Sequence, residues 1–489
     1  MPKTALVIGS GIAGLATALR LKAKGYHVIV FEKNSYPGGK LHSKKVNGYR
    51  FDLGPSLFTM PWLVTELFEL HGKRPDTYFE YIKKETICNY FWEDRTRFTV
   101  KSDKEDFIEK AAILFGEDAK QIKRYLDDNK KKYELTSSIF LEKSLHKVQT
   151  YLSKKTVKAL LRIGGMGIQN TMNNTNMQYF QNPKLIQLFN RYATYNGSSP
   201  YRTPGIMSMI PHLEMDLGTY FPKGGMHNIT KSLYQLALDV GIVFHFNSNV
   251  DEILIENDKA IGLRLRTETV FGDMVISNMD VYPTYKKLLP EIKHPRKILN
   301  QERSSSALIF YWGIAKTFPE LDLHNIMFSE DYKKEFDHIF NKKSLFEDTT
   351  VYINVTSKEN REDAPEGCEN WFVMINAPAN HGQDWGKLAA MARKSVIRKI
   401  NTILNTDIEE YIETEFVLDP IEIEQNTSSY RGALYGAASN SKLAAFLRHP
   451  NFSSKTKNLY FCGGSVHPGG GIPLCLLSSK IVNDLVPNA

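Results

Sequence analysis

A glycine motif near the N-terminus constrains the fold more than any other feature of the sequence. The GxGxxG motif that starts at Gly9 follows an apolar segment, residues 4–8, which is typical of a buried parallel strand. Helical periodicity follows over residues 15–23, and a second apolar segment over residues 27–31 ends in Glu32. This order predicts a βαβ unit that binds a dinucleotide, and hence an α/β protein with a Rossmann-type domain.

Each position of the motif has a physical task in such a unit. Gly9 allows a tight turn, Gly11 lets the backbone approach a pyrophosphate, and Gly14 lets the helix pack closely on the strand. The free amides at the helix N-terminus attract the negative charge. We expect Glu32 to accept hydrogen bonds from ribose hydroxyls.

Length and charge limit the remaining possibilities. A chain of 489 residues exceeds one ordinary core and predicts two or three lobes. The net charge of +8 lies in one stretch, because residues 120–162 contain 12 Lys and Arg against four Asp and Glu. Averaged over 489 residues, a net charge of +8 is small, which argues against nucleic acid as a partner. The four cysteines have no zinc-ligand spacing, so we predict no metal site and a reducing, cytoplasmic location.

Glycine turns and a cation follow the βαβ unit. They occupy residues 36–40, which end in Lys40, and residues 51–56. A simple NAD-binding domain would instead continue with another βα repeat. This extension favours FAD as the cofactor.

The C-terminus carries a second glycine-rich turn. A short apolar strand at residues 459–462 is followed by glycines, His467 and Pro468, and then by an uncharged apolar run. This pattern predicts a helix that begins near Ile472. Its N-terminal amides would face the negative charge that develops on a flavin during reduction.

These motifs together resemble the flavoprotein family that includes amine oxidases and phytoene-desaturase-type carotenoid desaturases. The C-terminal turn is similar to the desaturase version, and so are segments in the middle of the chain, at residues 191–201, 210–214, 220–226 and 275–280. The similarity runs from the first strand to the last helix. Among these desaturases, the chain most resembles the branch that forms the 3,4 double bond of 1-hydroxylated carotenoids.

The resemblance implies a discontinuous FAD-binding domain at residues 1–75, 207–290 and 425–489. A mixed α+β substrate domain would comprise residues 76–206 and 291–424, with a helical lid or membrane-facing subdomain that includes a basic helical segment at 120–162. The cofactor-binding residues that we predict are Gly9, Gly11, Ala13, Gly14, Glu32, Lys40, Gly54, Ser56, Leu57, Val250, Asn278, Gly464, Gly471 and Ile472.

The implied chemistry is the removal of two hydrogens from adjacent carbons. The flavin takes a hydride from an allylic carbon, and the delocalised cation then loses a proton without needing a strong base. We therefore assign no catalytic residue. His467, Glu214 and His212 are weak candidates, for which structural roles are favoured, and we expect Asp52 to order a turn beside the flavin.

A carotenoid dissolves in membranes, so the enzyme must reach it from a membrane surface. The lysine-rich stretch offers Leu141, Leu145, Val148 and Leu152 at helical spacing, and Val157, Leu160 and Leu161 continue the apolar pattern. Two interpretations stay open, an anionic-membrane dock or a solvated helix that packs on its own lobe. We expect a protein peripheral to the membrane, with oxygen or a membrane quinone as the electron acceptor.

Alternatives to a carotenoid 3,4-desaturase also follow from these motifs. One is a phytoene desaturase that acts at several positions, and another is a flavin amine oxidase, which would need an aromatic cage for an amine. A third is a flavin-binding scaffold without activity, which the complete cofactor signature disfavours. Nothing in the sequence indicates an oligomeric state.

Overall fold

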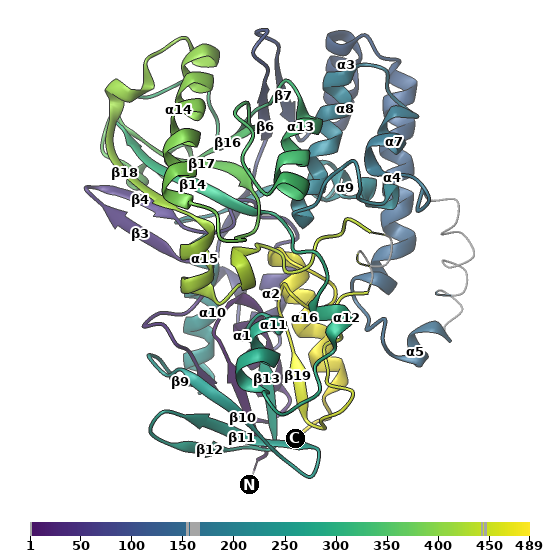
Figure 1. Ribbon diagram of the computed structural model, residues 1–489, viewed down its shortest axis with the longest axis vertical. Coiled ribbons are helices and arrows are strands. Elements are labelled where there is room, and N and C mark those ends of the chain that lie inside the picture. Colours follow the sequence, from purple (N-terminus) through teal and green to yellow (C-terminus); the bar gives the residue numbers. More distant parts are fainter. Residues whose placement is uncertain (1, 153–155, 157–166, 442–443, 445–446) are drawn as a thin grey trace.

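The computed structural model describes residues 2–152, 156, 167–441, 444 and 447–489. Two large sheets lie at opposite ends of the molecule, and helices cover each of them (Figure 1). Both chain termini lie at the same end.

The first large sheet is parallel and contains the glycine motif. Its order is β19-β13-β1-β2-β9, with β1 at Thr4–Ile8, β2 at His27–Phe31, β9 at Val243–His245, β13 at Met274–Ser277 and β19 at Leu459–Phe461. Helix α1, Ile12–Ala23, connects β1 to β2. The predicted βαβ unit is therefore confirmed.

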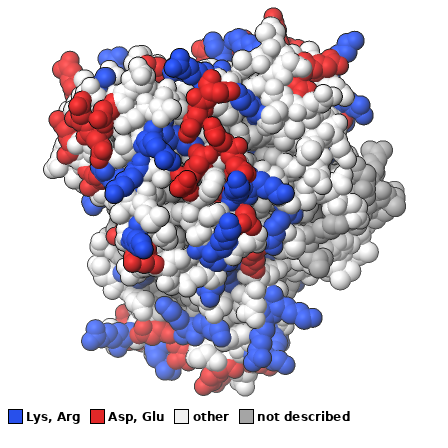
Figure 2. Space-filling model, turned by 45° about the horizontal axis from the view of Figure 1, so that its top comes forward, with Lys and Arg blue, Asp and Glu red and all other residues white. Residues whose placement is uncertain are grey.

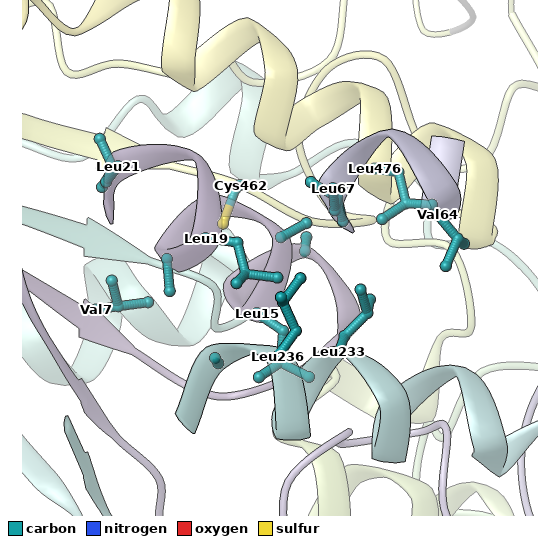
Figure 3. Packing of buried hydrophobic residues seen from close by; sticks show 14 of the residues in the cluster. Val7, Leu15, Leu19, Leu21, Val64, Leu67, Leu233, Leu236, Cys462 and Leu476 are labelled. Carbon is teal, nitrogen blue, oxygen red and sulfur yellow. The ribbon is translucent and has the colours of Figure 1, made fainter. Parts of the chain in front are cut away.

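The two faces of this sheet are covered differently. Side chains of β1 alternate, so that Ala5 and Val7 join one core and Leu6 and Ile8 join another. Helices cover the first face; they are α1, α2 (Trp62–Glu69), α10 (His227–Asp239) and α16 (Ile472–Leu485), whose leucines interdigitate in Figure 3. A three-stranded antiparallel sheet covers the second face, with β10 at Val250–Glu256, β11 at Lys259–Leu265 and β12 at Thr269–Phe271.

The second large sheet has seven strands in the order β18-β14-β17-β16-β15-β6-β7. They are β6 (Thr86–Phe91), β7 (Arg97–Lys101), β14 (Ser306–Ile314), β15 (His324–Met327), β16 (Val351–Val355), β17 (Glu369–Ala377) and β18 (Ile412–Leu418). All neighbours pair antiparallel except β15 and β6. All nine residues of β14 are buried, because its two faces contribute to different cores.

Shorter elements complete the chain. Hairpins pair β3 (Ser43–Val46) with β4 (Tyr49–Asp52) and β5 (Tyr81–Lys83) with β8 (Tyr220–Pro222). The other α-helices are α3 (Lys104–Phe115), α4 (Ala119–Phe140), α5 (Val148–Tyr151), α7 (Met172–Met177), α8 (Pro183–Asn190), α9 (Pro211–Met215), α11 (Val281–Pro283), α12 (Arg296–Leu299), α13 (Tyr332–Asp337), α14 (Trp385–Leu404) and α15 (Pro420–Thr427).

Strands of the parallel sheet come from residues 1–75, 207–290 and 425–489, and strands of the seven-stranded sheet come from the two intervening stretches. The exact domain boundaries stay a prediction.

The lysine-rich stretch differs from the single helix that its periodicity predicts. Helix α4 ends at Phe140, and residues 141–147 are not helical. Leu145 is 6% exposed, whereas Val148 and Leu152 are 72% and 75% exposed, so these side chains do not form one apolar stripe. The prediction was wrong here because tertiary packing interrupts the pattern. Val157, Leu160 and Leu161 lie outside the described residues.

Some cations of this stretch have partners in the structure. Lys123 pairs with Glu105 of α3 and Asp127 of α4, and Lys132 turns inward, where its ammonium donates to Asn129 and Ser208. Blue and red side chains are interspersed over the face shown in Figure 2. Among the described residues, no helix is long and apolar enough to cross a membrane.

Candidate active site

One large cavity of about 570 Å³ lies at the carboxyl ends of the parallel strands. Gly9, Glu32, Asn278 and Gly464 line it, and these residues follow β1, β2, β13 and β19 in turn. Crevices at this edge are where open parallel sheets bind ligands. The opposite wall comes from the seven-stranded sheet and includes the apolar side chains of Ile309, Ile326, Phe372 and Met374.

The structure brings the predicted cofactor-binding residues together. Those that line the cavity are Gly9, Gly11, Ala13, Glu32, Lys40, Gly54, Ser56, Leu57, Val250, Asn278, Gly464, Gly471 and Ile472. Gly14 does not line it. A Cβ atom at Gly14 would lie 2.1 Å from the Gly9 carbonyl oxygen, so this glycine allows α1 to pack against the turn.

The glycine turn forms a cradle with little room for side chains. Gly9 has a φ of +90°, which favours glycine. A Cβ at Gly11 would lie 2.8 Å from Asn278 Oδ1, so a larger residue would push this strand end aside. Helix α1 begins directly after Gly11 with its amides free, which fits a diphosphate group.

Glu32 is held in place at the end of β2. The backbone amide and hydroxyl of Ser10 each donate to its Oε2 at 2.8 Å, and the Asn34 amide donates to Oε1 at 3.0 Å. These bonds orient the carboxylate along the cavity, where its remaining lone pairs fit ribose hydroxyls.

Two further features suit an anionic cofactor. The Lys40 ammonium donates to the Leu434 carbonyl at 2.8 Å, and burial lowers the pKa of Lys40 from its ordinary value. Helix α16 begins at Ile472, as predicted, with Gly471 before it, and both residues line the cavity. Its N-terminus places a partial positive charge at the cavity wall.

Glu214 lies in the cavity wall, where its carboxylate accepts three side-chain hydrogen bonds. Arg191 donates to its Oε2 at 2.6 Å, and the hydroxyls of Tyr192 and Tyr195 donate to its two oxygens. Burial and the neighbouring Glu214 raise the pKa of Tyr195 well above its ordinary value, so this phenol stays a donor. These three donors occupy most of the lone pairs of the carboxylate and give Glu214 a structural role.

The two histidine candidates are also engaged in structural contacts. His467 lines the cavity, and its Nε2 lies 2.9 Å from the Lys143 carbonyl oxygen. Burial lowers the pKa of His467 to about 4, so the ring is neutral near pH 7 and donates to that carbonyl. His212 is not among the lining residues, and its Nδ1 lies 2.8 Å from Asp216.

Asp52 ties the β3–β4 hairpin to the start of α10. It accepts hydrogen bonds from the amides of Met226 and His227, both at 2.9 Å, and from the Arg50 guanidinium at 2.7 Å. These contacts order the end of the β3–β4 hairpin, and a role for Asp52 beside the flavin stays a prediction.

Residue-by-residue reasoning missed several polar groups in the cavity. Arg191 and Tyr195 stand in a segment that resembles the desaturases, but their contact with Glu214 is not visible in the chain order. His324 and Tyr352 also line the cavity, from β15 and β16. Their surroundings in sequence are ordinary strands, so no local signal identifies them.

The sheet order and the glycine-lined crevice define a Rossmann-type α/β fold. The family of flavin-containing amine oxidoreductases matches residues 12–486, and the chain therefore belongs to this flavin-dependent family.

Individual proteins within and beyond this family are similar to the chain in sequence or in fold. The chain is 62% identical over 488 residues to the 1-hydroxycarotenoid 3,4-desaturase of Flavobacterium sp. (strain P99-3), covering 99% of both chains. It is 32% identical over 495 residues to the 4,4'-diaponeurosporene oxygenase of Staphylococcus aureus (strain MSSA476), covering 99% of this chain and 98% of the other. An oxidoreductase from Methanosarcina mazei has the same fold, with a TM-score of 0.64 at 15% identity and coverage of 98% and 100%.

Proposed function

We propose that this protein is an FAD-dependent carotenoid desaturase that introduces the 3,4 double bond into a 1-hydroxylated carotenoid. The observation that carries the proposal is the 62% identity, over nearly the whole of both chains, to a relative with that activity. The apolar wall opposite the glycine turns supports it, because a polyene needs such a surface.

The dinucleotide form of the flavin is part of this proposal. Ile472, Gly11, Glu32 and Val250 all line one cavity, which supports a cofactor with a ring system, a diphosphate and an adenosine. The Val250 backbone would meet the adenine. When bound, FAD supplies a hydride acceptor.

The chain's own residues supply alignment and a dry site. The N-terminus of α16 would stabilise negative charge on a bound flavin. The side chains of Ile309, Phe372 and Met374 exclude water from the polyene. Because Glu214 and His467 are occupied by structural contacts, the proton leaves without a dedicated strong base.

Reduced flavin must pass its electrons on, and we propose oxygen or a membrane quinone as acceptor. The same proposal includes a discontinuous FAD-binding domain at residues 1–75, 207–290 and 425–489 and a substrate-binding domain at residues 76–206 and 291–424. It also includes a cytoplasmic location on the membrane surface.

Membrane contact would involve α5. Phe140 and Leu141 line the cavity, and the exposed Val148 and Leu152 follow within twelve residues. Lys143 lies between them and is exposed. An apolar tip beside a cation suits an anionic bilayer surface and would bring a dissolved substrate near the cavity.

Vesicle flotation tests this contact. We expect more binding to anionic than to neutral vesicles, and weaker binding by the double variant Val148→Ser with Leu152→Ser. A matched control is Ile113→Ser with Leu114→Ser, which removes exposed apolar side chains from α3. Equal binding to both vesicle types, or none, contradicts the electrostatic contact.

Product analysis tests the activity. Flavin-loaded protein is given phytoene, lycopene and a 1-hydroxycarotenoid, and the products are identified by chromatography and absorption spectra. We expect the hydroxylated substrate to gain one double bond at C3–C4. Conversion of phytoene alone would favour the phytoene desaturase, and oxidation of a soluble amine would favour the amine oxidase.

A further inference from the structure

A chain of three side chains joins the loop beside the glycine turns to the seven-stranded sheet. The Tyr352 hydroxyl on β16 donates to Ser56 Oγ at 2.9 Å, and Nδ1 of His324 on β15 lies 2.7 Å from the same Tyr352 oxygen. All three residues line the cavity. Ser56 belongs to the loop, residues 54–57, that we predict to bind the flavin.

His324 carries an unused polar atom. Its side chain is 3% exposed, and its Nε2 has no hydrogen-bond partner within the described part of the chain. Burial lowers the pKa of His324 to about 3, so the imidazole is neutral near pH 7. A buried ring nitrogen without a partner destabilises the site unless a ligand group pairs with it.

The other unpaired lining atoms of the described residues have different surroundings. His42, with an unpaired Nδ1, stacks on Tyr36 at 3.8 Å in the glycine-rich turn on the cofactor side. Arg191, with an unpaired Nε, packs 4.1 Å over the Tyr192 ring and already donates to Glu214. His324 is therefore the unpaired group on the strands opposite the glycine turns.

Resting on the desaturase function proposed above, we propose that Ser56, Tyr352 and His324 form the subsite that binds the hydroxyl group of the substrate. A hydroxyl both donates and accepts, so it suits either tautomer of the imidazole. With the proton on Nδ1, Tyr352 accepts from His324 while it donates to Ser56, and Nε2 accepts the substrate O–H. With the proton on Nε2, Tyr352 donates to Nδ1 instead of to Ser56, and Nε2 donates to the substrate oxygen. A hydrocarbon end group does neither.

The position of the chain fits the reaction. The hydroxyl of such a substrate is on C1, two carbon–carbon bonds from the C3 atom that is oxidised. A subsite for this hydroxyl must therefore lie close to the flavin, and this chain starts at the flavin-binding loop. The neighbouring Ile326 and Phe372 supply apolar surface for the hydrocarbon.

The test compares two substrates in three variants. A 1-hydroxycarotenoid and the same carbon skeleton without the hydroxyl are given to flavin-loaded wild type, Tyr352→Phe, His324→Leu and the control Tyr332→Phe. Tyr332 lines the same cavity from α13 but stands outside the chain of three. Binding is measured by retention of each carotenoid on the protein, and turnover by kcat/KM.

We expect wild type to prefer the hydroxylated carotenoid by roughly tenfold or more in both measurements. Tyr352→Phe and His324→Leu should reduce this preference about tenfold, chiefly by lowering the retention and the kcat/KM of the hydroxylated substrate. Tyr332→Phe should keep the preference of the wild type. Equal losses for both substrates, an unchanged preference, or no preference in wild type would each overturn the subsite.

The two proposals fail in different ways. If the preference in binding disappears in Tyr352→Phe but wild type forms no double bond, the subsite stands and the desaturase function falls. If wild type desaturates both carotenoids and the variants keep its preference, the function stands and the subsite falls.

Discussion

The two walls of the cavity are built on different principles. The parallel-sheet wall depends on backbone packing within short motifs: Gly14, which lies behind the wall, lets α1 pack against the Gly9 turn that lines the cavity. The wall of the seven-stranded sheet and its helices uses side-chain clusters from distant segments, such as Arg191 with Glu214 and His324 with Tyr352. A flavin shared across the family suits a fixed backbone cradle, whereas substrates that differ between the named relatives suit exchangeable side chains.

The largest effect is expected from Gly14→Val, which disturbs the backbone packing behind the parallel-sheet wall. The new side chain would collide with the Gly9 carbonyl, which no side-chain rotation relieves, so we expect the purified protein to lose most of its flavin. The ratio of flavin to protein absorbance measures this. Gly386→Ala is the control, since its Cβ meets only Asp384 at 3.6 Å. Full flavin content in Gly14→Val would contradict the cradle.

The corresponding break on the side-chain wall is Arg191→Leu. It leaves the buried Glu214 without its ion partner, which should lower the free energy of unfolding by about 3–5 kcal/mol. Urea denaturation measures the loss. Arg74→Leu removes the exposed pair with Asp76 and should have little effect. Similar small losses for both variants would show that the cluster adds no stability.

Acid should destabilise the fold at His467, because burial disfavours the charged form of its ring. The pKa of His467 is about 4 in the folded protein and 6.5 in an ordinary exposed histidine, so unfolding takes up a proton between these values. Stability is therefore full above pH 6.5 and falls as the pH drops toward 4, by up to about 3 kcal/mol from this group. Thermal denaturation over this range checks it.

His467→Gln should reduce that pH dependence by the contribution of this ring, while buried histidines such as His324 and His449 keep theirs. The exposed His245→Gln is the control and should keep the slope of the wild type. A slope that His467→Gln leaves unchanged would assign the acid sensitivity to other groups.

The smallest loss of stability is expected from Asp52→Asn. This side chain joins the β3–β4 hairpin to the start of α10, on the side of the parallel sheet. Loss of the charge weakens the bond to Arg50 and the cap on α10, which should cost about 1.5 kcal/mol. Asp103→Asn, an exposed cap of α3, should cost less, because the amide oxygen still accepts from the helix. Equal losses in the free energy of unfolding for both variants, measured by urea denaturation, would show that the pair of Asp52 with Arg50 adds no stability.

The sequence predicts the backbone wall well because its signals are local. The strand at Thr4–Ile8 and the helix start at Ile472 agree with the structure to the residue. The lysine-rich stretch shows the limit. Its apolar periodicity continues through residues 141–152, but Leu145 packs inward while Val148 and Leu152 are exposed, because the chain turns between α4 and α5.

By itself, the sequence determined the half built on the parallel sheet, since glycine spacing, strand and helix lie within a few tens of residues and Gly14 avoids a steric clash with Gly9, which is close to it in sequence. Only the tertiary structure decided the half built on the seven-stranded sheet. Ser56 and Tyr352 are 296 positions apart, and they meet only when the seven-stranded sheet brings β16 over the loop at residues 54–57. Hydrogen bonds between such distant residues leave no period or spacing in the chain, because each partner is chosen by the fold and not by its neighbours in sequence.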